Sequence, residues 1–288
     1  MTLSELKTLF TEKLNNQYET TEISSFYYWL VEAYLGLKRI DISLNPNHKL
    51  PKSDENRFIE ALKRLEQDEP LQYILGETEF YGLQFSVNKH VLIPRPETET
   101  LVEWIIKDIG KISAAGKNQT LKLLDIGTGS GCIAVSLAKN LPHWQVSGLD
   151  VSENALKVAK TNAKQNEVEV NFFQQNILEW KAAGEQWDLI VSNPPYVRQL
   201  EKSEMRPNVL NYEPEQALFV ADDDALLFYR KITAFAEKNL KPDGKLYFEI
   251  NEYLGEQTRD LVTDFDFKKI ELRKDYFGKF RMLKAIKR

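Results

Sequence analysis

From residue 97 onward, the sequence alternates between segments that favour helix and segments that favour strand. Helices are expected from the sequences ETETLVEWIIKDI, CIAVSLAKNL, SENALKVAKTNAKQN and ALLFYRKITAFAEKNL. Strands are expected from LKLLDIG, WQVSGLD, EVNFFQ, WDLIVSN and GKLYFEI. Alternation of this kind requires a parallel sheet with helices on both of its faces. The chain is therefore predicted to contain a doubly wound α/β domain.

The alternation stops near the C-terminus, where the strand-like segments FKKIELRKD and RMLKAIKR are separated only by YFGKF. This connection is too short for a helical crossover, so the last two strands are predicted to form an antiparallel hairpin. Together with the earlier strands they make a predicted sheet of seven strands, most of them parallel.

Residues 1–76 are predicted to form a small helical domain that precedes the sheet. Apolar residues recur at helical spacing from Leu3 to Leu14, and ISSFYYWLVEAYLG follows as a second helical segment. Ser53 is the expected N-cap of a third helix, NRFIEALKRLEQ. A short fourth helix, PLQYILG, is expected to end at Gly76.

Residues 77–96 are rich in β-forming side chains. A turn is expected at Asn88-Lys89, so this segment is predicted to be a hairpin. The hairpin would link the helical domain to an α/β domain at residues 97–288.

The composition favours a protein of the cytoplasm. The chain of 288 residues is 42% apolar and can bury a substantial core, yet it has no run near the roughly 18–20 apolar residues needed to cross a bilayer. The N-terminal sequence lacks the apolar stretch of a signal peptide, and the single cysteine, Cys132, excludes an internal disulfide.

The net charge of −5 argues against a protein that wraps nucleic acid. His48, His90 and His143 are scattered and unaccompanied by cysteine pairs, so no metal site is expected.

The sequence LLDIGTGSGC places a glycine-rich loop directly after a predicted strand and before a predicted helix. Glycines at this point let the backbone turn tightly and approach a ligand with no Cβ in the way. The spacing is G-x-G-x-G, and Ile133 stands where the dinucleotide-binding pattern has its last glycine, which argues against NAD. The loop residues expected to bind a cofactor are Gly127, Thr128, Gly129, Ser130 and Gly131.

The next two strand ends are expected to face the same ligand. Asp150 ends the second strand, where a carboxylate can accept both hydroxyl hydrogens of a ribose. The alternative is that it caps the following helix, a role that Ser152 fills equally well. At the end of the third strand, Asn176 is a candidate to hydrogen-bond the exocyclic amine of adenine and Ile177 to pack on its ring. A simple turn explains these two residues nearly as well.

The apolar run WDLIV leads directly into Asn193, Pro194, Pro195 and Tyr196. Prolines stop strands because they lack an N–H and fix φ, so an ordinary loop is one explanation. In a doubly wound sheet, this strand lies beside the strand that carries the glycine loop, and ligands bind outside the carboxyl ends of such strands. Asn193 and the glycine loop are therefore predicted to face one crevice.

The DIGTGSG loop, the acidic end of the second strand and NPPY together resemble the S-adenosylmethionine-dependent methyltransferases that act on a planar nitrogen. Such a nitrogen is a poor nucleophile because its lone pair is delocalised. Asn193 Oδ1 and the Pro194 carbonyl can accept its two N–H hydrogens and turn the lone pair toward the methyl group. The resemblance implies that Pro195 adds rigidity, that Tyr196 supplies a wall for the flat group, and that Asn193 also contacts the cofactor.

Over essentially the whole chain, the sequence resembles the protein-(glutamine-N5) methyltransferases that modify class I peptide chain release factors. The stretches that carry the resemblance include PLQYILGETEF, PRPETE, EPEQALFVADDDAL and RKDYFGKFRML. The resemblance implies methyl transfer from S-adenosyl-L-methionine to the glutamine of a Gly-Gly-Gln motif, with S-adenosyl-L-homocysteine as product. A separate helical domain beside a methyltransferase core suggests recognition of something larger than an amino acid, so residues 1–76 and the hairpin at 79–94 are expected to dock the release factor. The enzyme is expected to be a cytoplasmic monomer without direct contact to nucleic acid or membrane.

The sequence departs from the family pattern at two places. Asn176-Ile177 stands where members often carry an Asp-Trp or similar pair, which leaves the adenine contacts open. Residues 249–251, EIN, stand where a glycine often ends the motif.

Three alternative functions are considered beside this one. The first is methylation of a glutamine in a ribosomal protein. The second is N6-adenine methylation of nucleic acid, since NPPY is shared with DNA adenine methyltransferases, but residues 1–90 carry 14 acidic and 10 basic side chains, which disfavours it. The third is a catalytically inactive binding module, which is expected to have lost Asp150, Asn193 or a loop glycine, and all of these are present.

Overall fold

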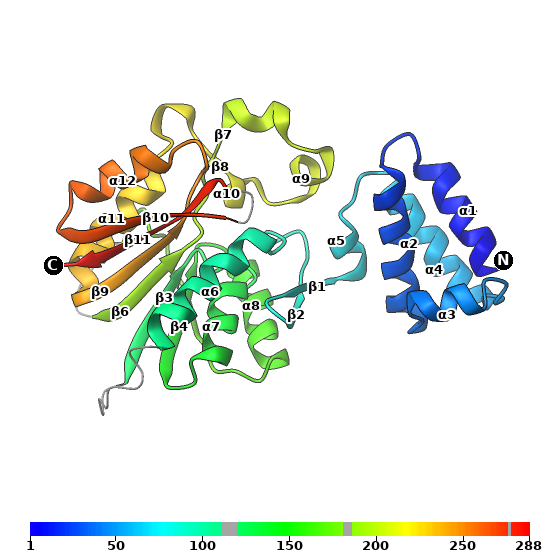
Figure 1. Ribbon diagram of the computed structural model, residues 1–288, viewed down its shortest axis with the longest axis horizontal. Coiled ribbons are helices and arrows are strands. Elements are labelled where there is room, and N and C mark those ends of the chain that lie inside the picture. The colour runs from blue at the N-terminus through cyan, green and yellow to red at the C-terminus, as the bar shows by residue number, and fades with distance from the viewer. Residues whose placement is uncertain (111–119, 181–185, 276–277) are drawn as a thin grey trace. The chain divides into compact units, whose positions relative to one another are not determined.

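The computed structural model describes residues 1–110, 120–180, 186–275 and 278–288, which form two compact units (Figure 1). The first unit consists of Met1–Gly76 together with Arg206–Tyr212, and the second of Glu77–Met205 together with Glu213–Arg288. The chain therefore leaves the second unit after Met205 and returns to it at Glu213.

The first unit is built of helices around one apolar core. Its helices are α1 (Leu3–Leu14), α2 (Thr20–Leu35), α3 (Arg39–Leu44), α4 (Lys52–Leu65), α5 (Leu71–Leu75) and α9 (Pro207–Tyr212). Leu6, Phe10 and Leu14 on α1 are fully buried and pack with Tyr27 and Phe58 in one cluster, as their helical spacing predicts.

Two details of the first unit differ from the sequence prediction. Helix α3 is not among the predicted elements. Ser53 is wrong as an N-cap, because α4 begins at Lys52 and follows Pro51, whose fixed φ of −56° leads into the first helical turn. The predicted end of α5 is confirmed, since Gly76 stops that helix in the left-handed conformation with a φ of 79°.

The second unit begins with a hairpin of two antiparallel strands, β1 (Glu77–Phe80) and β2 (Leu83–Ser86). Its turn is Tyr81-Gly82, with φ angles of 50° and 71°, so the turn predicted at Asn88-Lys89 is wrong. A two-residue hairpin turn with positive φ at both positions matches the twist of the strands, and Gly82 adopts that conformation without strain. Asn88 instead accepts a hydrogen bond from the backbone N–H of His90 at 3.0 Å.

The predicted seven-stranded sheet is confirmed, and its strand order is β10-β11-β9-β6-β3-β4-β5. The strands are β3 (Leu121–Ile126), β4 (Trp144–Asp150), β5 (Asn171–Gln174), β6 (Trp187–Ser192), β9 (Leu240–Glu249), β10 (Phe267–Lys274) and β11 (Phe280–Lys287). Neighbours from β9 to β5 are parallel, whereas β11 runs antiparallel to β9 and pairs with β10 as the predicted hairpin. Because β6 lies beside β3, Ser192 pairs with Ile126 and the two strands end at the same edge.

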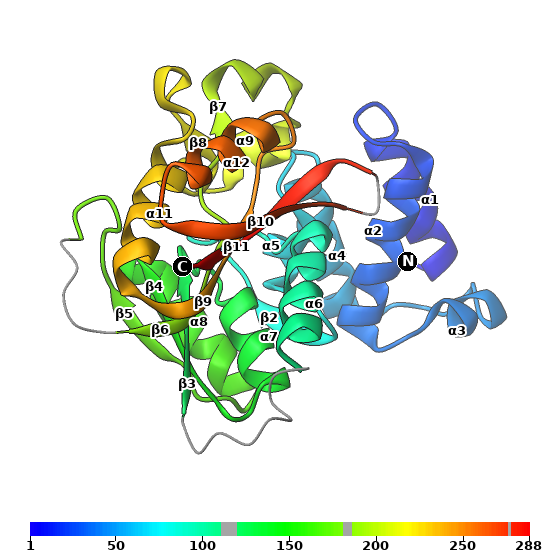
Figure 2. The same ribbon diagram turned by 60° about the vertical axis from the view of Figure 1, so that its left-hand side comes forward.

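Helices cover both faces of this sheet (Figure 2). They are α6 (Pro96–Gly110), α7 (Cys132–Asn140) and α8 (Glu153–Gln165) on one face, with α11 (Leu227–Asn239) and α12 (Gly255–Thr263) on the other. Consecutive residues of β3 belong to opposite faces: Leu123 packs in the core under α6, α7 and α8, and Leu124 in the core under α11. This two-sided burial is why the strands consist of continuous apolar runs.

The connection between β6 and α11, predicted as one long loop, contains several short elements. Besides α9 they are β7 (Val197–Arg198), η1 (Gln199–Glu204), α10 (Glu215–Leu218), β8 (Phe219–Val220) and η2 (Asp222–Asp224). Strands β7 and β8 pair in parallel with each other. Helix α12, between β9 and β10, is not among the predicted elements either.

Candidate active site

The glycine loop starts where β3 ends. The backbone N–H groups of Gly127 and Thr128 both donate to the Leu149 carbonyl at 2.9 Å, which fixes the loop against β4. Gly127 and Gly129 have φ angles of 74° and 55°, a region that favours glycine, so the backbone conformation itself requires these residues. A Cβ at either position would meet no heavy atom within 4 Å among the described residues, so this side of the loop is open to a ligand.

A cavity of about 280 Å³ lies at the carboxyl ends of β3, β4, β5 and β6. It brings together eight of the predicted site residues: Gly127, Gly129, Asp150, Asn176, Ile177, Asn193, Pro194 and Pro195. Much of the remaining lining is apolar and includes Leu92, Leu149, Leu178, Phe228 and Ile232. The cavity therefore has polar groups at the strand ends and apolar walls between them, as small-molecule sites commonly do.

The carboxylate of Asp150 is held by backbone on both sides. Its Oδ2 accepts from the N–H of Gly129 and its Oδ1 from the N–H of Ser152, each at 2.9 Å. The helix-cap alternative does not apply, because Ser152 is the N-cap of α8 and accepts from the N–H of Ala155 at 3.2 Å. Burial raises the pKa of Asp150, and the backbone hydrogen bonds oppose that rise. Each oxygen keeps acceptor capacity for a ribose hydroxyl.

Asn176 uses its side-chain oxygen locally. Its Oδ1 accepts from the backbone N–H of Leu178 at 3.0 Å, while its Nδ2 has no partner among the described residues. The side chain therefore offers a donor, which suits a ring nitrogen of adenine, whereas the sequence suggested an acceptor for the exocyclic amine. Ile177 lines the cavity and packs against the core under α11.

Three predicted loop residues contact other parts of the unit. The hydroxyl of Thr128 donates to Asp125 Oδ2 at 2.6 Å, and the Ser130 carbonyl accepts from Asn162 Nδ2 at 2.8 Å. Gly131 is the N-cap of α7 with a φ of 81°. The side chains of Thr128 and Ser130 are buried. For these two residues, contact with a cofactor is therefore predicted only for backbone atoms.

The NPPY residues follow β6. The Ser192 hydroxyl donates to the Ile126 carbonyl at 2.7 Å, which joins the ends of β6 and β3. Asn193 Nδ2 donates to Thr98 Oγ1 at 3.3 Å, and Asn193 Oδ1 has no partner among the described residues. Asn193 therefore lines the cavity with one of its two polar atoms already engaged.

Tyr196 lines a smaller cavity of about 50 Å³. Four residues line both cavities: Leu92, Asn193, Pro194 and Ala217. The aromatic wall predicted for a flat substrate group would therefore lie in this small cavity. Arg95 also lines it and forms an ion pair with Glu213 at 2.5 Å, and Glu213 in turn accepts from the N–H of Ile93 at 3.0 Å.

Two residues under the NPPY segment were not among the predicted site residues. The Tyr196 hydroxyl donates to Glu249 Oε1 at 3.0 Å, and Asn251 Nδ2 donates to the Tyr196 carbonyl at 3.0 Å. Burial raises the pKa of Glu249, and hydrogen bonds from Thr98 and Tyr196 and the charge of Arg281 oppose that rise. The available signal was the sequence EIN at the end of β9, the strand next to β6.

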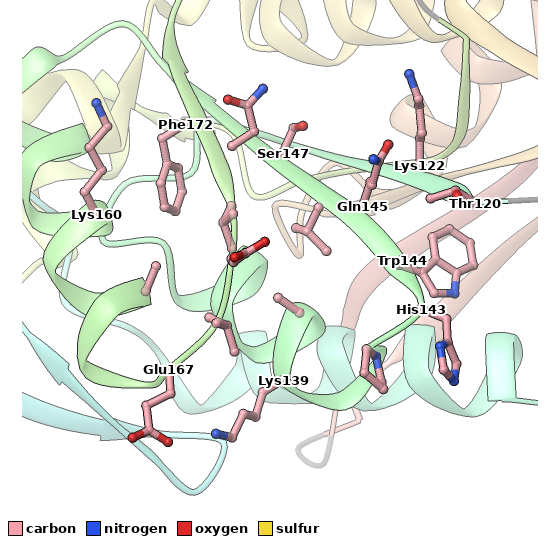
Figure 3. Close-up of a pocket in the computed structure, with 18 of the residues that line it drawn as sticks. Thr120, Lys122, Lys139, His143, Trp144, Gln145, Ser147, Lys160, Glu167 and Phe172 are labelled. Atoms are coloured by element: carbon pink, nitrogen blue, oxygen red, sulfur yellow. The ribbon is translucent and has the colours of Figure 1, made fainter.

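A larger hollow of about 1260 Å³ lies at the opposite, amino-terminal edge of the sheet (Figure 3). Lys122, Trp144 and Gln145, at the starts of β3 and β4, line it. None of the predicted site residues is among the described residues that line it. Ligands of doubly wound sheets bind at the carboxyl ends of the strands, so the smaller, two-part site at NPPY is the candidate active site.

Within the described part of the chain, no group of three or more His, Cys, Asp or Glu side chains is arranged to hold a metal ion. The same residues include no helix that combines the length and the apolar character needed to cross a membrane.

The sequence matches two family models and close curated relatives. Residues 5–76 match the PrmC N-terminal domain, and residues 111–213 match the Methyltransferase small domain. A release factor glutamine methyltransferase of Flavobacterium psychrophilum is 52% identical, with 99% of each chain covered. One of Bacteroides thetaiotaomicron is 41% identical, covering 95% of this chain and 96% of the relative. The fold resembles a methyltransferase from Pyrococcus furiosus with a TM-score of 0.50 at 17% identity, over 82% of this chain and 98% of that one.

Proposed function

The chain belongs to the release factor glutamine methyltransferase family, and from that membership we propose that it methylates the N5 amide nitrogen of the glutamine in the Gly-Gly-Gln motif of class I peptide chain release factors. The observation that carries this proposal is the cavity shared by the glycine loop, Asp150 and Asn193. One site thus offers a hydrogen-bond acceptor for ribose hydroxyls, Asp150, and beside it an acceptor for the N–H groups of a planar amide, Asn193.

The residues present fit S-adenosylmethionine, the methyl donor of this family. The open side of the glycine loop suits the amino-acid part of the cofactor, Asp150 suits the ribose hydroxyls, and the apolar walls with Asn176 suit adenine. When bound, the cofactor supplies a methyl group made electrophilic by the sulfonium sulfur, and S-adenosylhomocysteine is the product.

The chain's own contribution is to orient and stabilise the attacking nitrogen. Asn193 Oδ1 and the Pro194 carbonyl accept the two N–H hydrogens of the substrate amide, so that its lone pair points toward the methyl group. As positive charge develops on the nitrogen, these acceptors bind the transition state more strongly than the ground state. Tyr196 confines the flat amide on one side. No general base is needed before attack, because the methylated nitrogen releases one of its hydrogens to water as a proton after the transfer.

We also propose that the first unit recognises the release factor, because the amide slot alone does not distinguish one exposed glutamine from another. Trp29 on α2 and Ile40 and Leu44 on α3 are exposed apolar side chains, 47%, 62% and 78% accessible. Ile40 and Leu44 are four residues apart on α3 and so lie on one face of that helix, and exposed apolar side chains grouped in this way mark contact sites for a protein partner. We also propose, as the sequence suggests, that the enzyme is a monomer and acts in the cytoplasm.

The direct test is incubation of the purified protein with radiolabelled S-adenosylmethionine and, in parallel, a class I release factor, ribosomal proteins and DNA. Label is expected only in the release factor, at the Gly-Gly-Gln glutamine, and is expected to disappear when that glutamine is replaced by Asn in the factor. Label in a ribosomal protein or in DNA, with none in the release factor, would contradict the proposal.

A further inference from the structure

Glu249 is a buried carboxylate that holds two hydroxyl groups. It is 1% exposed at the end of β9, its Oε2 accepts from Thr98 Oγ1 at 2.6 Å, and its Oε1 accepts from the Tyr196 hydroxyl at 3.0 Å. Thr98 is itself 2% exposed on α6. A carboxylate in this position is kept only when its oxygens are hydrogen-bonded, and both of them are.

The direction of each hydrogen bond follows from the chemistry of the groups. When Glu249 is ionised it has no proton to give, so in that state the single hydroxyl hydrogen of Thr98 points at Glu249. The remaining hydrogen-bonding capacity of Thr98 Oγ1 is that of an acceptor, and it accepts from Asn193 Nδ2 at 3.3 Å. The amino end of the Asn193 amide therefore lies toward Thr98, and its oxygen is left for the cavity.

The opposite orientation of the Asn193 amide would create two unfavourable contacts. Its Oδ1 would face the oxygen of Thr98, which has no second hydrogen to donate. Its Nδ2 would face the substrate amide, whose N–H hydrogens need acceptors. Two amino groups facing each other remove the interaction that activates the nitrogen.

We propose that Thr98 and Glu249 are positioning residues that set the orientation of the Asn193 amide. In this orientation the Asn193 oxygen faces the amide nitrogen to be methylated, so the inference rests on the proposed function. They act through Asn193 and do not touch substrate or cofactor. This proposal gives a shared role to two stretches of the sequence: PRPETE, which contains Thr98, and EIN, which contains Glu249.

The chain supplies a matched pair of test positions on one helix. Thr98 and Thr100 are both buried on α6, but Thr100 Oγ1 has no hydrogen-bond partner among the described residues. Thr98→Val and Thr100→Val each replace a buried hydroxyl by a methyl group of similar size. Thr98→Ser keeps the hydroxyl at the position of interest and serves as the rescuing variant.

Activity is measured on a Gly-Gly-Gln peptide with the full chain. Thr98→Val is expected to lower kcat about tenfold, the scale of one neutral hydrogen bond, with little change in KM or in the Kd of S-adenosylhomocysteine. Thr98→Ser is expected to restore most of kcat, and Thr100→Val to leave it unchanged. A wild-type kcat in Thr98→Val, or a Thr98→Ser variant as impaired as Thr98→Val, would overturn the proposal.

A double-mutant cycle separates positioning from general damage to the site. In an Asn193→Ala background there is no amide to orient, so adding Thr98→Val is expected to change the single-turnover rate no further. Independent, multiplicative losses would mean that Thr98 acts by another route.

One readout does not depend on the reaction. In protein labelled with nitrogen-15 at asparagine, the Asn193 side-chain amide signal is assigned by its absence in Asn193→Ala. Its hydrogens are expected to exchange faster with solvent in Thr98→Val than in Thr100→Val. Equal exchange in the two variants would overturn the orientation proposal, whereas absence of methylation by the wild-type chain would count against the proposed function alone.

Discussion

The carboxylate of Asp150 accepts a hydrogen bond from the backbone N–H of Gly129 at 2.9 Å, which joins the end of β4 to the loop that follows β3. A second backbone N–H, from Ser152, holds the other oxygen at the same distance. The acceptor proposed for the ribose is therefore set in place before any ligand arrives. Preorganisation of this kind lowers the ordering cost of binding.

Asp150→Ala is expected to weaken the binding of S-adenosylhomocysteine by at least about tenfold, measured as Kd by calorimetric titration. The variant loses two hydrogen bonds between the carboxylate and the ribose, each of which contributes at most about 3 kcal/mol. It also loses the hydrogen bond that Gly129 of the glycine loop donates to Asp150. Ser152→Ala is the control, since it removes the cap of α8 at a cost of about 1 kcal/mol in stability but keeps the Asp150 carboxylate. A Kd that is the same in Asp150→Ala and wild type would show that Asp150 only supports the loop.

Asn193→Ala is expected to lower kcat by at least about 100-fold, the scale of losing one group that stabilises transition-state charge. Its Kd for S-adenosylhomocysteine should change little, because the proposed contacts of the amide are mainly to substrate. Steady-state kinetics on the peptide and calorimetry on the product complex measure the two effects separately. Turnover like that of wild type would remove Asn193 from the mechanism.

Asp125 is expected to make stability depend on pH. Burial raises its pKa from 3.8 to about 7, so between these values the unfolded chain releases a proton that the folded chain keeps. The stabilisation from this group is fully present below about pH 4 and is lost as the pH rises to 7, up to an amount on the order of 4 kcal/mol.

The measurement is urea unfolding, without cofactor, of wild type and Asp125→Asn at several pH values. The free energy of unfolding of wild type minus that of the variant is expected to fall steadily from pH 4 to pH 7. A constant difference over this range would mean that Asp125 titrates near its ordinary pKa.

Gly131→Ala is expected to destabilise the second unit more than Gly82→Ala. Both glycines have positive φ angles, 81° and 71°, so both substitutions carry backbone strain of about 1–2 kcal/mol. At Gly131 the new Cβ would also lie 3.1 Å from the Cβ of Ala159 on α8, whereas at Gly82 nothing described lies within 4 Å. Urea unfolding of the two variants compares the costs, and equal costs would mean that α8 moves freely away from the loop.

Polar substitution of the exposed apolar residues on the first unit tests the proposed recognition of the release factor. Trp29→Ser combined with Leu44→Ser is expected to raise KM for the intact factor severalfold and to leave KM for a short Gly-Gly-Gln peptide unchanged. Substitution is preferable to deletion of residues 1–76, because α9 belongs to the first unit and deletion would remove its packing partners. An unchanged KM for the intact factor would place recognition elsewhere.

The sheet was predictable because each strand is buried on both faces and therefore consists of an apolar run, as in Leu123 and Leu124 of β3. Helix α12 escaped prediction because its buried positions are Gly255, Thr258 and Val262, of which only one is a large apolar side chain. Helix α3 buries only Ile42. Elements with so little apolar pattern are determined by the surrounding packing.

Strand order accounts for the part of the site that was predictable. Residues at the carboxyl ends of neighbouring parallel strands meet, so Asp150 and Asn193 were expected in one crevice and both line it. Thr98 and Glu249, in contrast, are 151 residues apart, and their contact depends on how α6 packs near β9. No local pattern encodes such a pair, and the same holds for Arg95 and Glu213.

Helix α9 is inserted between NPPY and the EPEQ stretch, yet it belongs with residues 1–76. Within this group, Tyr212 donates to the Gln67 carbonyl at 2.7 Å, and Arg206 forms an ion pair with Glu22 at 3.0 Å. A ribosome that has made residues 1–76 has therefore not yet made the whole of the first unit. Its last helix emerges only after the glycine loop, Asp150 and NPPY, so the nascent chain cannot complete its two units one after the other.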